Sequence, residues 1–190
     1  AFALLLTGCA GGGAGETSGA SGNAAKVAAG VDTDTVNYAL PPNATPNWIL
    51  PIGTAGKMAT HNYSISQSIW SPLMTFDGSK GEMKLDLETG IADKMDYAAN
   101  GKSVTFHLRD MHWSDGTAIT TRDVEFWFNL IKANKEAWGG YKEGRLPDNI
   151  TKIDYTDDKT FTLNFDKVYN QDWMSSTQLI SIRPLPHHAW

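Results

Sequence analysis

Histidine side chains are the first candidates for chemistry in this chain of 190 residues, because they bind metals and transfer protons. His187 and His188 are adjacent, a spacing that does not put two ligands on one face of a helix. No cysteine, and no acidic residue close to them in the sequence, completes a zinc site. His61, His107 and His112 are scattered, and His107 falls on the polar face of a predicted strand, where solvent exposure is expected. We therefore predict a polar loop at the histidine pair and no bound metal.

Carboxylates are the second candidates, because a glycoside hydrolase uses two of them held about 5–9 Å apart. The richest stretch contains Asp86, Glu88, Asp93 and Asp96. Lysines lie among these acids, which is typical of a solvated face, and the sequence does not establish the distance between two carboxyl groups. The chain also contains no Gly-x-Ser-x-Gly elbow, no phosphate-binding loop and no His-Glu-x-x-His motif. We predict no catalytic residues and no cofactor, with a surface-anchored glycoside hydrolase as the less favoured alternative.

Cys9, the single cysteine, is the residue with the clearest predicted chemistry. It follows Leu6, Thr7 and Gly8, and this order resembles a bacterial lipobox, in which the cysteine thiol receives a lipid and becomes the mature N-terminus. The apolar run before them is far shorter than the roughly 20 residues that span a bilayer, and it suits the end of a signal peptide. We predict that the residues before Cys9 (1–8) are removed, that Cys9 is lipidated and that the chain contains no disulfide.

A low-complexity stretch of Gly, Ala and Ser follows at 10–30 and has almost no large apolar side chains. Such a segment cannot bury enough surface to offset its ordering entropy, so we expect a flexible tether over 9–33. About 20 residues of this kind give a root-mean-square reach of about 25 Å. Because there is no initiator methionine and an apolar segment runs up to the last residues, we expect a fragment of a longer protein.

The charge balance argues against another class of function. The formal net charge is −5 and the basic residues are mixed with acidic ones, whereas nucleic-acid binding needs a basic patch. We therefore predict no nucleic-acid partner, and contact with a membrane only through the lipid. The seven Trp and six Tyr residues would suit a ligand groove, although burial in the core is the commoner use of such side chains.

Hydrophobic periodicity predicts the elements that position these residues. Strands are expected at 35–40, 73–76, 104–108, 153–155 and 161–165, and helices at 61–70 and after 120. In the second helix, Val124, Trp127, Phe128 and Ile131 repeat at helical spacing after a capping box formed by Thr120 and Asp123. A tight turn is expected before it, and the elements together make a small mixed α/β, or α+β, body.

One continuous signature runs from the 104–108 strand into this helix. Its residues are Phe106, Leu108, Arg109, Trp113, Ser114, Asp115, Gly116, Thr120, Asp123, Val124 and Phe126. The order resembles the family-five extracellular solute-binding proteins, the oligopeptide and dipeptide receptors of ABC importers, with a minor departure at 119–122. Segments 70–77, 160–163 and 184–188 are also similar to that family. The resemblance covers about 35–190 and only the N-terminal third of the family's length, and we expect the signature to carry the fold rather than to touch ligand.

The resemblance implies a periplasmic-binding-protein-like fold with two lobes, of which only the first third is present. By analogy, residues 34–72 begin lobe I, residues 73–182 form a small inserted subdomain, and residues 183–190 start the return to lobe I. It also implies a secreted, monomeric receptor anchored to the outer face of the cytoplasmic membrane. Such a receptor captures oligopeptides and delivers them to the permease of an ABC importer, with an oligosaccharide or a nickel chelate as the alternative solute.

The resemblance also places the ligand cleft beside the segment that precedes the 73–76 strand. His61, Asn62 and Tyr63 in that segment are therefore candidates for binding ligand. Trp138 and Tyr141, which follow the second helix beside glycines, are the other candidates, because aromatic rings there could stack on a peptide. For all five residues, an ordinary surface position without ligand contact is the alternative.

Overall fold

The computed structural model of the chain describes residues 40, 42, 44–54, 56, 59–79 and 81–190, which belong to one compact unit, Leu40–Trp190. The lipobox, the tether and nearly all of the strand expected at 35–40 lie outside the described residues, so these expectations stay predictions. No described helix has the length and apolarity needed to cross a membrane.

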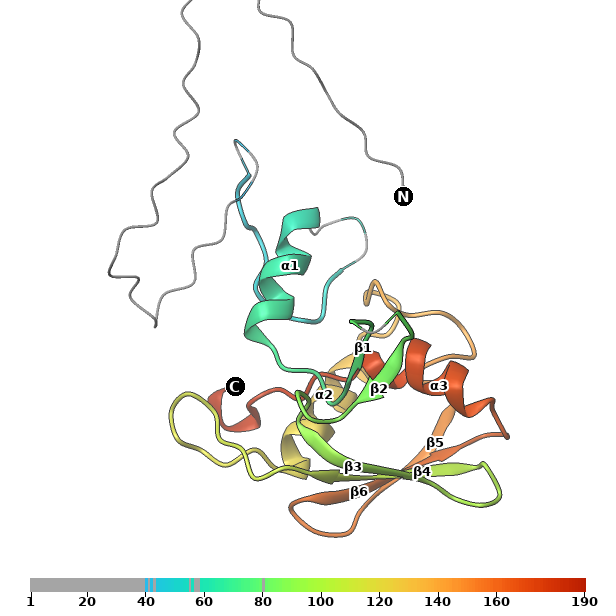
Figure 1. Ribbon diagram of the computed structural model, residues 1–190. Helices are drawn as coiled ribbons and strands as arrows, with labels where there is room; N and C mark the ends of the chain where they lie inside the picture. The colour runs from blue at the N-terminus through green and yellow to red at the C-terminus, as the bar shows by residue number, and fades with distance from the viewer. Residues whose placement is uncertain (1–39, 41, 43, 55, 57–58, 80) are drawn as a thin grey trace, which may run out of the picture. The chain divides into compact units, whose positions relative to one another are not determined.

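A four-stranded antiparallel sheet forms the centre of the described chain, with its strands in the order β3-β4-β6-β5 (Figure 1). The strands are β3 (Ala92–Tyr97), β4 (Ser103–Leu108), β5 (Ile150–Tyr155) and β6 (Thr160–Phe165). The central strands β4 and β6 pair so that Phe106 lies opposite Phe161, and these rings stack with their centroids 5.2 Å apart. The alternation predicted for both strands is confirmed, because every second side chain of each is buried.

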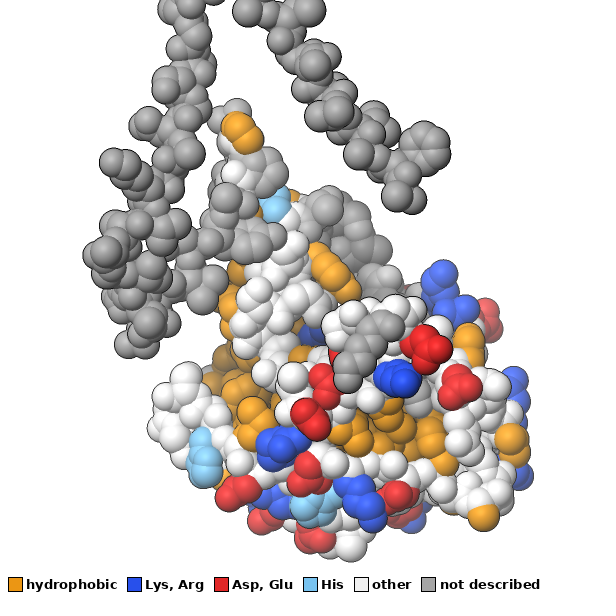
Figure 2. Space-filling model, viewed as in Figure 1, with side chains coloured by type: hydrophobic (Ala, Val, Ile, Leu, Met, Phe, Trp, Pro, Cys, Tyr) orange, Lys and Arg blue, Asp and Glu red, His pale blue; other side chains and the backbone are white. Residues whose placement is uncertain are grey.

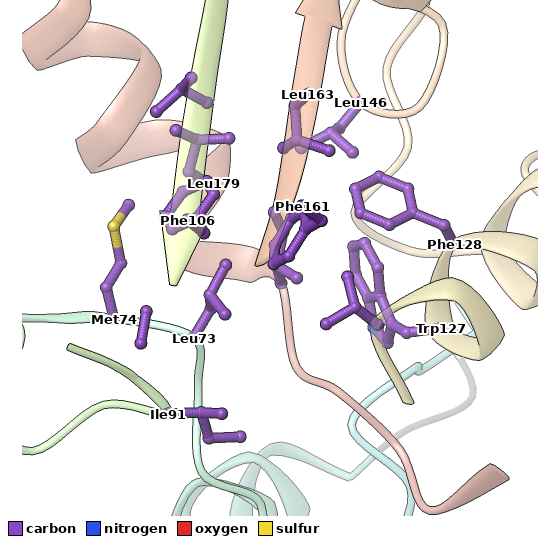
Figure 3. Close-up of a cluster of buried hydrophobic side chains, with 14 of the residues drawn as sticks. Leu73, Met74, Ile91, Phe106, Trp127, Phe128, Leu146, Phe161, Leu163 and Leu179 are labelled. Atoms are coloured by element: carbon purple, nitrogen blue, oxygen red, sulfur yellow. The ribbon is translucent and has the colours of Figure 1, made fainter. Parts of the chain in front are cut away.

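Helices cover the apolar face of this sheet. The remaining elements are α1 (Thr60–Ile69), β1 (Thr75–Asp77), β2 (Lys84–Asp86), α2 (Thr121–Ala133), α3 (Gln171–Thr177) and the 3-10 turns η1 (Leu179–Ser181) and η2 (His187–Ala189). Figure 3 shows Phe106 and Phe161 of the sheet facing Trp127 and Phe128 of α2. All four residues of the helical repeat predicted from the sequence are buried, which confirms that repeat.

The opposite face of the sheet is polar, as is common for an antiparallel sheet with one side in water. The hydroxyl groups of Thr105 and Thr162 lie 2.8 Å apart across β4 and β6. Nδ1 of His107 lies 2.9 Å from a carboxylate oxygen of Asp93. The exposure predicted for His107 is confirmed.

The edge strand β3 is absent from the sequence-based expectations. Asp93, Lys94 and Asp96 on this strand are exposed, and Lys94 pairs with Asp96 at 2.9 Å. Charged side chains on an edge strand discourage pairing with another chain, and the same charges hide the strand's apolar alternation in the sequence. The solvated position predicted for Asp93 and Asp96 is therefore confirmed, but it belongs to a strand, whereas Asp86 at the end of β2 is half-buried.

Residues 72–74 form a strap that joins two distant segments. The N–H of Leu73 donates to the carbonyl of Ile182 at 2.9 Å, and the carbonyl of Leu73 accepts from the N–H of Ala92 at 2.9 Å. Gly90 permits this close approach, because a Cβ there would lie 2.6 Å from the carbonyl oxygen of Leu73. Since Leu73 pairs in this way, the strand expected at 73–76 begins two residues later, at β1.

A fully buried carboxylate, Asp123, connects the signature turn, the start of α2 and the returning chain. Its Oδ2 accepts from the backbone N–H of Thr120 at 2.9 Å and from Nε1 of Trp113 at 3.3 Å. Its Oδ1 accepts from the backbone N–H of His187 at 3.0 Å and from Nδ1 of the same residue at 2.8 Å. The predicted capping box is confirmed, since the Thr120 hydroxyl accepts a backbone N–H in return. We call this set of contacts the Asp123 clamp.

Replacing Asp123 with alanine should destabilise the protein strongly, because it leaves four N–H donors without their acceptor. Unsatisfied buried donors cost about 1–3 kcal/mol each, so we expect a loss of at least about 3 kcal/mol in the free energy of unfolding, measured with urea. Asp110→Ala is the matched control, because it removes the same charge from a side chain that is 85% exposed, and it should change stability by no more than about 0.5 kcal/mol. Similar losses for the two variants would contradict the clamp.

Candidate functional site

Four segments that are distant in the sequence line one cleft of about 610 Å³, which we call the α1 cleft. They are the loop at 51–56, the middle of α1, residues 138–140 after α2, and the stretch at 177–183, which starts with the last residue of α3. The described lining combines two aromatic rings with hydroxyl and amide groups and one cation. Aromatic surface with a few polar groups is the usual character of a small-molecule or peptide site.

The loop at 51–56 is fixed to the segment after α2 by backbone pairing. Thr54 and Trp138 form an antiparallel bridge, and the N–H of Gly139 donates to the carbonyl of Gly53 at 2.7 Å. The Trp138 ring also meets Trp127 edge-on with centroids 5.9 Å apart, which anchors it to the core. A Cβ at Gly140 would lie 2.6 Å from Cζ2 of Trp138, so the lack of a side chain there leaves room for the indole.

Helix α1 supplies the other aromatic ring and the amide. Tyr63 is 64% exposed and lines the cleft together with Gln67. Asn62 is fully buried instead, where its side chain exchanges hydrogen bonds with Asn47, including one from the Asn47 backbone N–H at 3.2 Å. Asn62 therefore holds the loop before α1 in place beneath the surface that a ligand would touch.

The five candidate residues thus occupy different environments. Tyr63 and Trp138 lie together in the α1 cleft. His61 is half-buried, and its Nε2 has no hydrogen-bond partner within the described chain. Tyr141 lies outside the lining and donates to Asp148 at 2.7 Å, a hydrogen bond that raises the pKa of the tyrosine.

Arg183 is the charged residue among the cleft residues that sequence reasoning missed. It is half-buried, with Nη2 donating to Oε1 of Gln67 and Nη1 donating to the carbonyl of Ile180 at 3.3 Å. Burial lowers the pKa of this guanidinium, and the negative charge that Tyr63 can carry opposes the shift. In the sequence it stands between an apolar run and Pro184, and no local signal there indicates a cleft.

The histidine pair near the C-terminus differs from the sequence-based description. No acid lies close to this pair in the sequence, but the fold brings Asp123 against His187, and Asp115 lies 2.7 Å from Nε2 of His188. A backbone hydrogen bond from Thr117, then the contact with His188, lowers the pKa of Asp115 to about 2. The sequence alone does not indicate these acid partners, because residues remote in sequence meet at this turn.

These contacts also bring three potential metal ligands together. Ligand atoms of Asp123, His187 and His188 lie within 4.8 Å of one another. A carboxylate has about four acceptor positions, and the Asp123 clamp already occupies them with N–H donors. A metal ion at this cluster would have to displace one of these donors. We therefore infer that the three residues stabilise the fold.

A second cleft of about 610 Å³ lies between the β1–β2 pair, β3 and α3. Its lining includes Phe76, Met83, Leu85 and Met95, and Figure 2 shows hydrophobic side chains in this region bordered by charged ones. The hydroxyl of Tyr97 at its wall is 2.9 Å from that of Ser175. The α1 cleft is the better candidate because it contains Tyr63 and Trp138, whereas none of the five candidate residues lines the second cleft.

Comparison with known proteins identifies the family. The family described as bacterial extracellular solute-binding proteins, family 5 Middle, matches residues 86–188, more than half of the chain. The oligopeptide-binding protein OppA of Bacillus subtilis is 29% identical over 144 residues, which cover 74% of this chain and 23% of that relative. The family match at residues 86–188 contains the whole signature and the Asp123 clamp.

Solved structures share the fold at low identity. The substrate-binding protein CtaP of Listeria monocytogenes aligns with a TM-score of 0.58 and 21% identity, covering 76% of this chain and 27% of that one. NikZ of Campylobacter jejuni, in complex with Ni(L-His), aligns with a TM-score of 0.54 and 22% identity, covering 74% of this chain and 25% of that one. A mannohexaose-bound oligopeptide-binding protein of Thermotoga maritima aligns with a TM-score of 0.50 and 24% identity, covering 64% of this chain and 21% of that one. The expected mixed α/β, periplasmic-binding-protein-like fold is confirmed, and the chain spans about a quarter of these relatives.

The family is a substrate-binding component of transport and not an enzyme family, and its description as extracellular indicates a location outside the cytoplasm. The signature, the fold and the extent of the match agree. The chain therefore belongs to the bacterial extracellular solute-binding proteins, family 5.

Proposed function

We propose that this chain is the N-terminal part of an oligopeptide receptor that delivers its ligand to the permease of an ABC importer. The observation that carries the proposal is the α1 cleft, in which two aromatic rings, hydroxyl groups and glycine backbone from four segments face one space. Its relative OppA is named as an oligopeptide-binding protein, which favours a peptide over other solutes.

The lining suits a peptide of variable sequence. Tyr63 and Trp138 offer flat surfaces for side chains, while the exposed Gly139 has no side chain that would block approach by another main chain. Hydroxyl groups at the rim can bind bridging water, which tolerates different side chains. No bond is broken in this process, and the lining residues require no cofactor to perform it.

The mechanism is capture by closure of two lobes around the ligand, followed by docking of a monomeric receptor on the permease. In this proposal, residues 34–72 begin lobe I, residues 73–182 form the small subdomain, and residues 183–190 return to lobe I. The α1 cleft draws its lining from all three segments, so relative movement of the segments would open or close it.

Ligand identity is tested by native mass spectrometry of the full-length receptor purified from its host. We expect co-purified masses that fragment as peptides of several residues. Oligosaccharide or nickel-chelate masses would contradict the peptide assignment and favour the solutes found in the mannohexaose-bound and Ni(L-His)-bound relatives.

Replacing Tyr63 or Trp138 with alanine should weaken peptide binding, because each change removes aromatic contact surface. Central aromatic contacts are commonly worth more than about 1 kcal/mol, so we expect at least a roughly fivefold rise in the dissociation constant measured by calorimetry. Tyr63 is the cleaner variant, since it is 64% exposed and its removal leaves the core intact.

Tyr141→Ala provides the matched control for these variants. It removes an aromatic ring close to Trp138 in sequence but outside the lining of the cleft, so its affinity should equal that of the unaltered protein. Equal affinities for all three variants would remove the α1 cleft as the binding site.

We also propose that Cys9 is lipidated and holds the receptor at the outer face of the cytoplasmic membrane after removal of residues 1–8. In bacteria that express the full-length precursor and grow with labelled palmitate, we expect the label on the unaltered protein and none on Cys9→Ala. Ser18→Ala, which changes only the predicted tether, should keep the label. An unlabelled unaltered protein, or a labelled Cys9→Ala variant, would refute the anchor.

A further inference from the structure

Arg183 is the one charged side chain among the described residues that line the α1 cleft. It forms no ion pair with any carboxylate of the described chain. Its protein acceptors are the neutral oxygens of Gln67 and Ile180. A half-buried cation is thus held against the wall of a cleft without a negative partner.

The guanidinium is only partly occupied by these contacts. A guanidinium has five N–H donors in a planar fork. The contacts with Ile180 and Gln67 use one N–H of Nη1 and one N–H of Nη2. Nε has no partner in the described chain, and it is not among the buried unsatisfied atoms. Most of the fork is therefore available to an acceptor that enters the cleft.

Two other partly covered cations of the described chain, Lys135 and Lys159, have carboxylate partners, whereas Arg109 and Arg145 form no ion pair with a described carboxylate. Lys135 lies 3.0 Å from Asp148, and Lys159 lies 3.5 Å from Asp110. The protein carries a net charge of −5, so acids are not scarce. Arg183 differs from Arg109 and Arg145 because it is the one that lines the α1 cleft, where an entering solute can reach it.

We propose that Arg183 binds a carboxylate of the solute, which rests on the proposed function and narrows it to ligands that carry this group. A carboxylate matches the guanidinium fork and can accept two N–H bonds from it. Burial of the guanidinium, which lowers its pKa, disfavours a charge without a partner, and an incoming carboxylate offsets that cost. The carboxylate is either the C-terminus of a peptide or an acidic side chain.

The test uses the full-length receptor and three pools of tetrapeptides, with affinities measured by calorimetry. The first pool has free C-termini and no acidic residues, the second is its C-terminal amide, and the third is amidated but contains one Glu. Arg183→Gln removes the charge, and Gln67→Glu places a competing carboxylate beside the guanidinium. Arg122→Gln removes the same charge from an exposed position on α2 and is the control. Thermal unfolding establishes that each variant is folded.

We expect the unaltered receptor and Arg122→Gln to bind at least one carboxylate pool more tightly than the plain amide pool. Charge-assisted hydrogen bonds of this kind correspond to about 10-fold to 100-fold in affinity. Arg183→Gln and Gln67→Glu should both lose that difference in affinity between the carboxylate pools and the amide pool. A preference for the first pool identifies the C-terminal carboxylate as the source, and a preference for the third identifies an acidic side chain.

Two other results would overturn the inference. Equal affinity of the unaltered receptor for all three pools, or a preference that survives both Arg183→Gln and Gln67→Glu, would contradict a carboxylate at Arg183 while leaving peptide capture intact. If no pool binds the unaltered receptor, the proposed peptide function itself fails and the inference fails with it.

Discussion

The Asp123 carboxylate is fully buried and accepts N–H groups from the signature turn, from the start of α2 and from the returning chain at His187. A buried charge is tolerated only when such donors surround it, so the three segments cannot move apart without exposing an unpaired carboxylate. The backbone of the same residue also accepts from Leu185 at 3.2 Å. This constraint fixes where α2 begins and where the chain returns after α3.

The positions of the residues in the α1 cleft depend on where α2 begins and on where the chain returns after α3. Helix α2 is positioned by the clamp and packs Trp127 into the core, and Trp138 contacts Trp127 beyond the end of the helix. The returning chain passes the 72–74 strap through the pairing of Ile182 with Leu73, and Arg183 follows at once. Trp138 and Arg183 are widely separated in sequence. They face one cleft because the turn, the strap and the core fix the segments that carry them.

Sequence reasoning predicted the elements whose signal is local. The alternation around Phe106, the repeat through Trp127 and the capping box at Thr120 all appear as expected, because each depends on neighbours within a few residues. The edge strand β3 was missed because its charges obscure its alternation. The cleft position of Arg183 and the acid partner of His188 were missed because the contacts with Gln67 and Asp115 join positions more than 70 residues apart.

The central claim is that a solute binds in the α1 cleft, and amide hydrogen exchange of the full-length receptor tests it most directly. With a saturating peptide present, the account predicts slower exchange at the backbone amides around Thr54, at 138–140 and at 181–183, with little change on the polar face of the main sheet. Protection that is confined to other parts of the protein, at a peptide concentration that calorimetry shows to be saturating, would contradict the account.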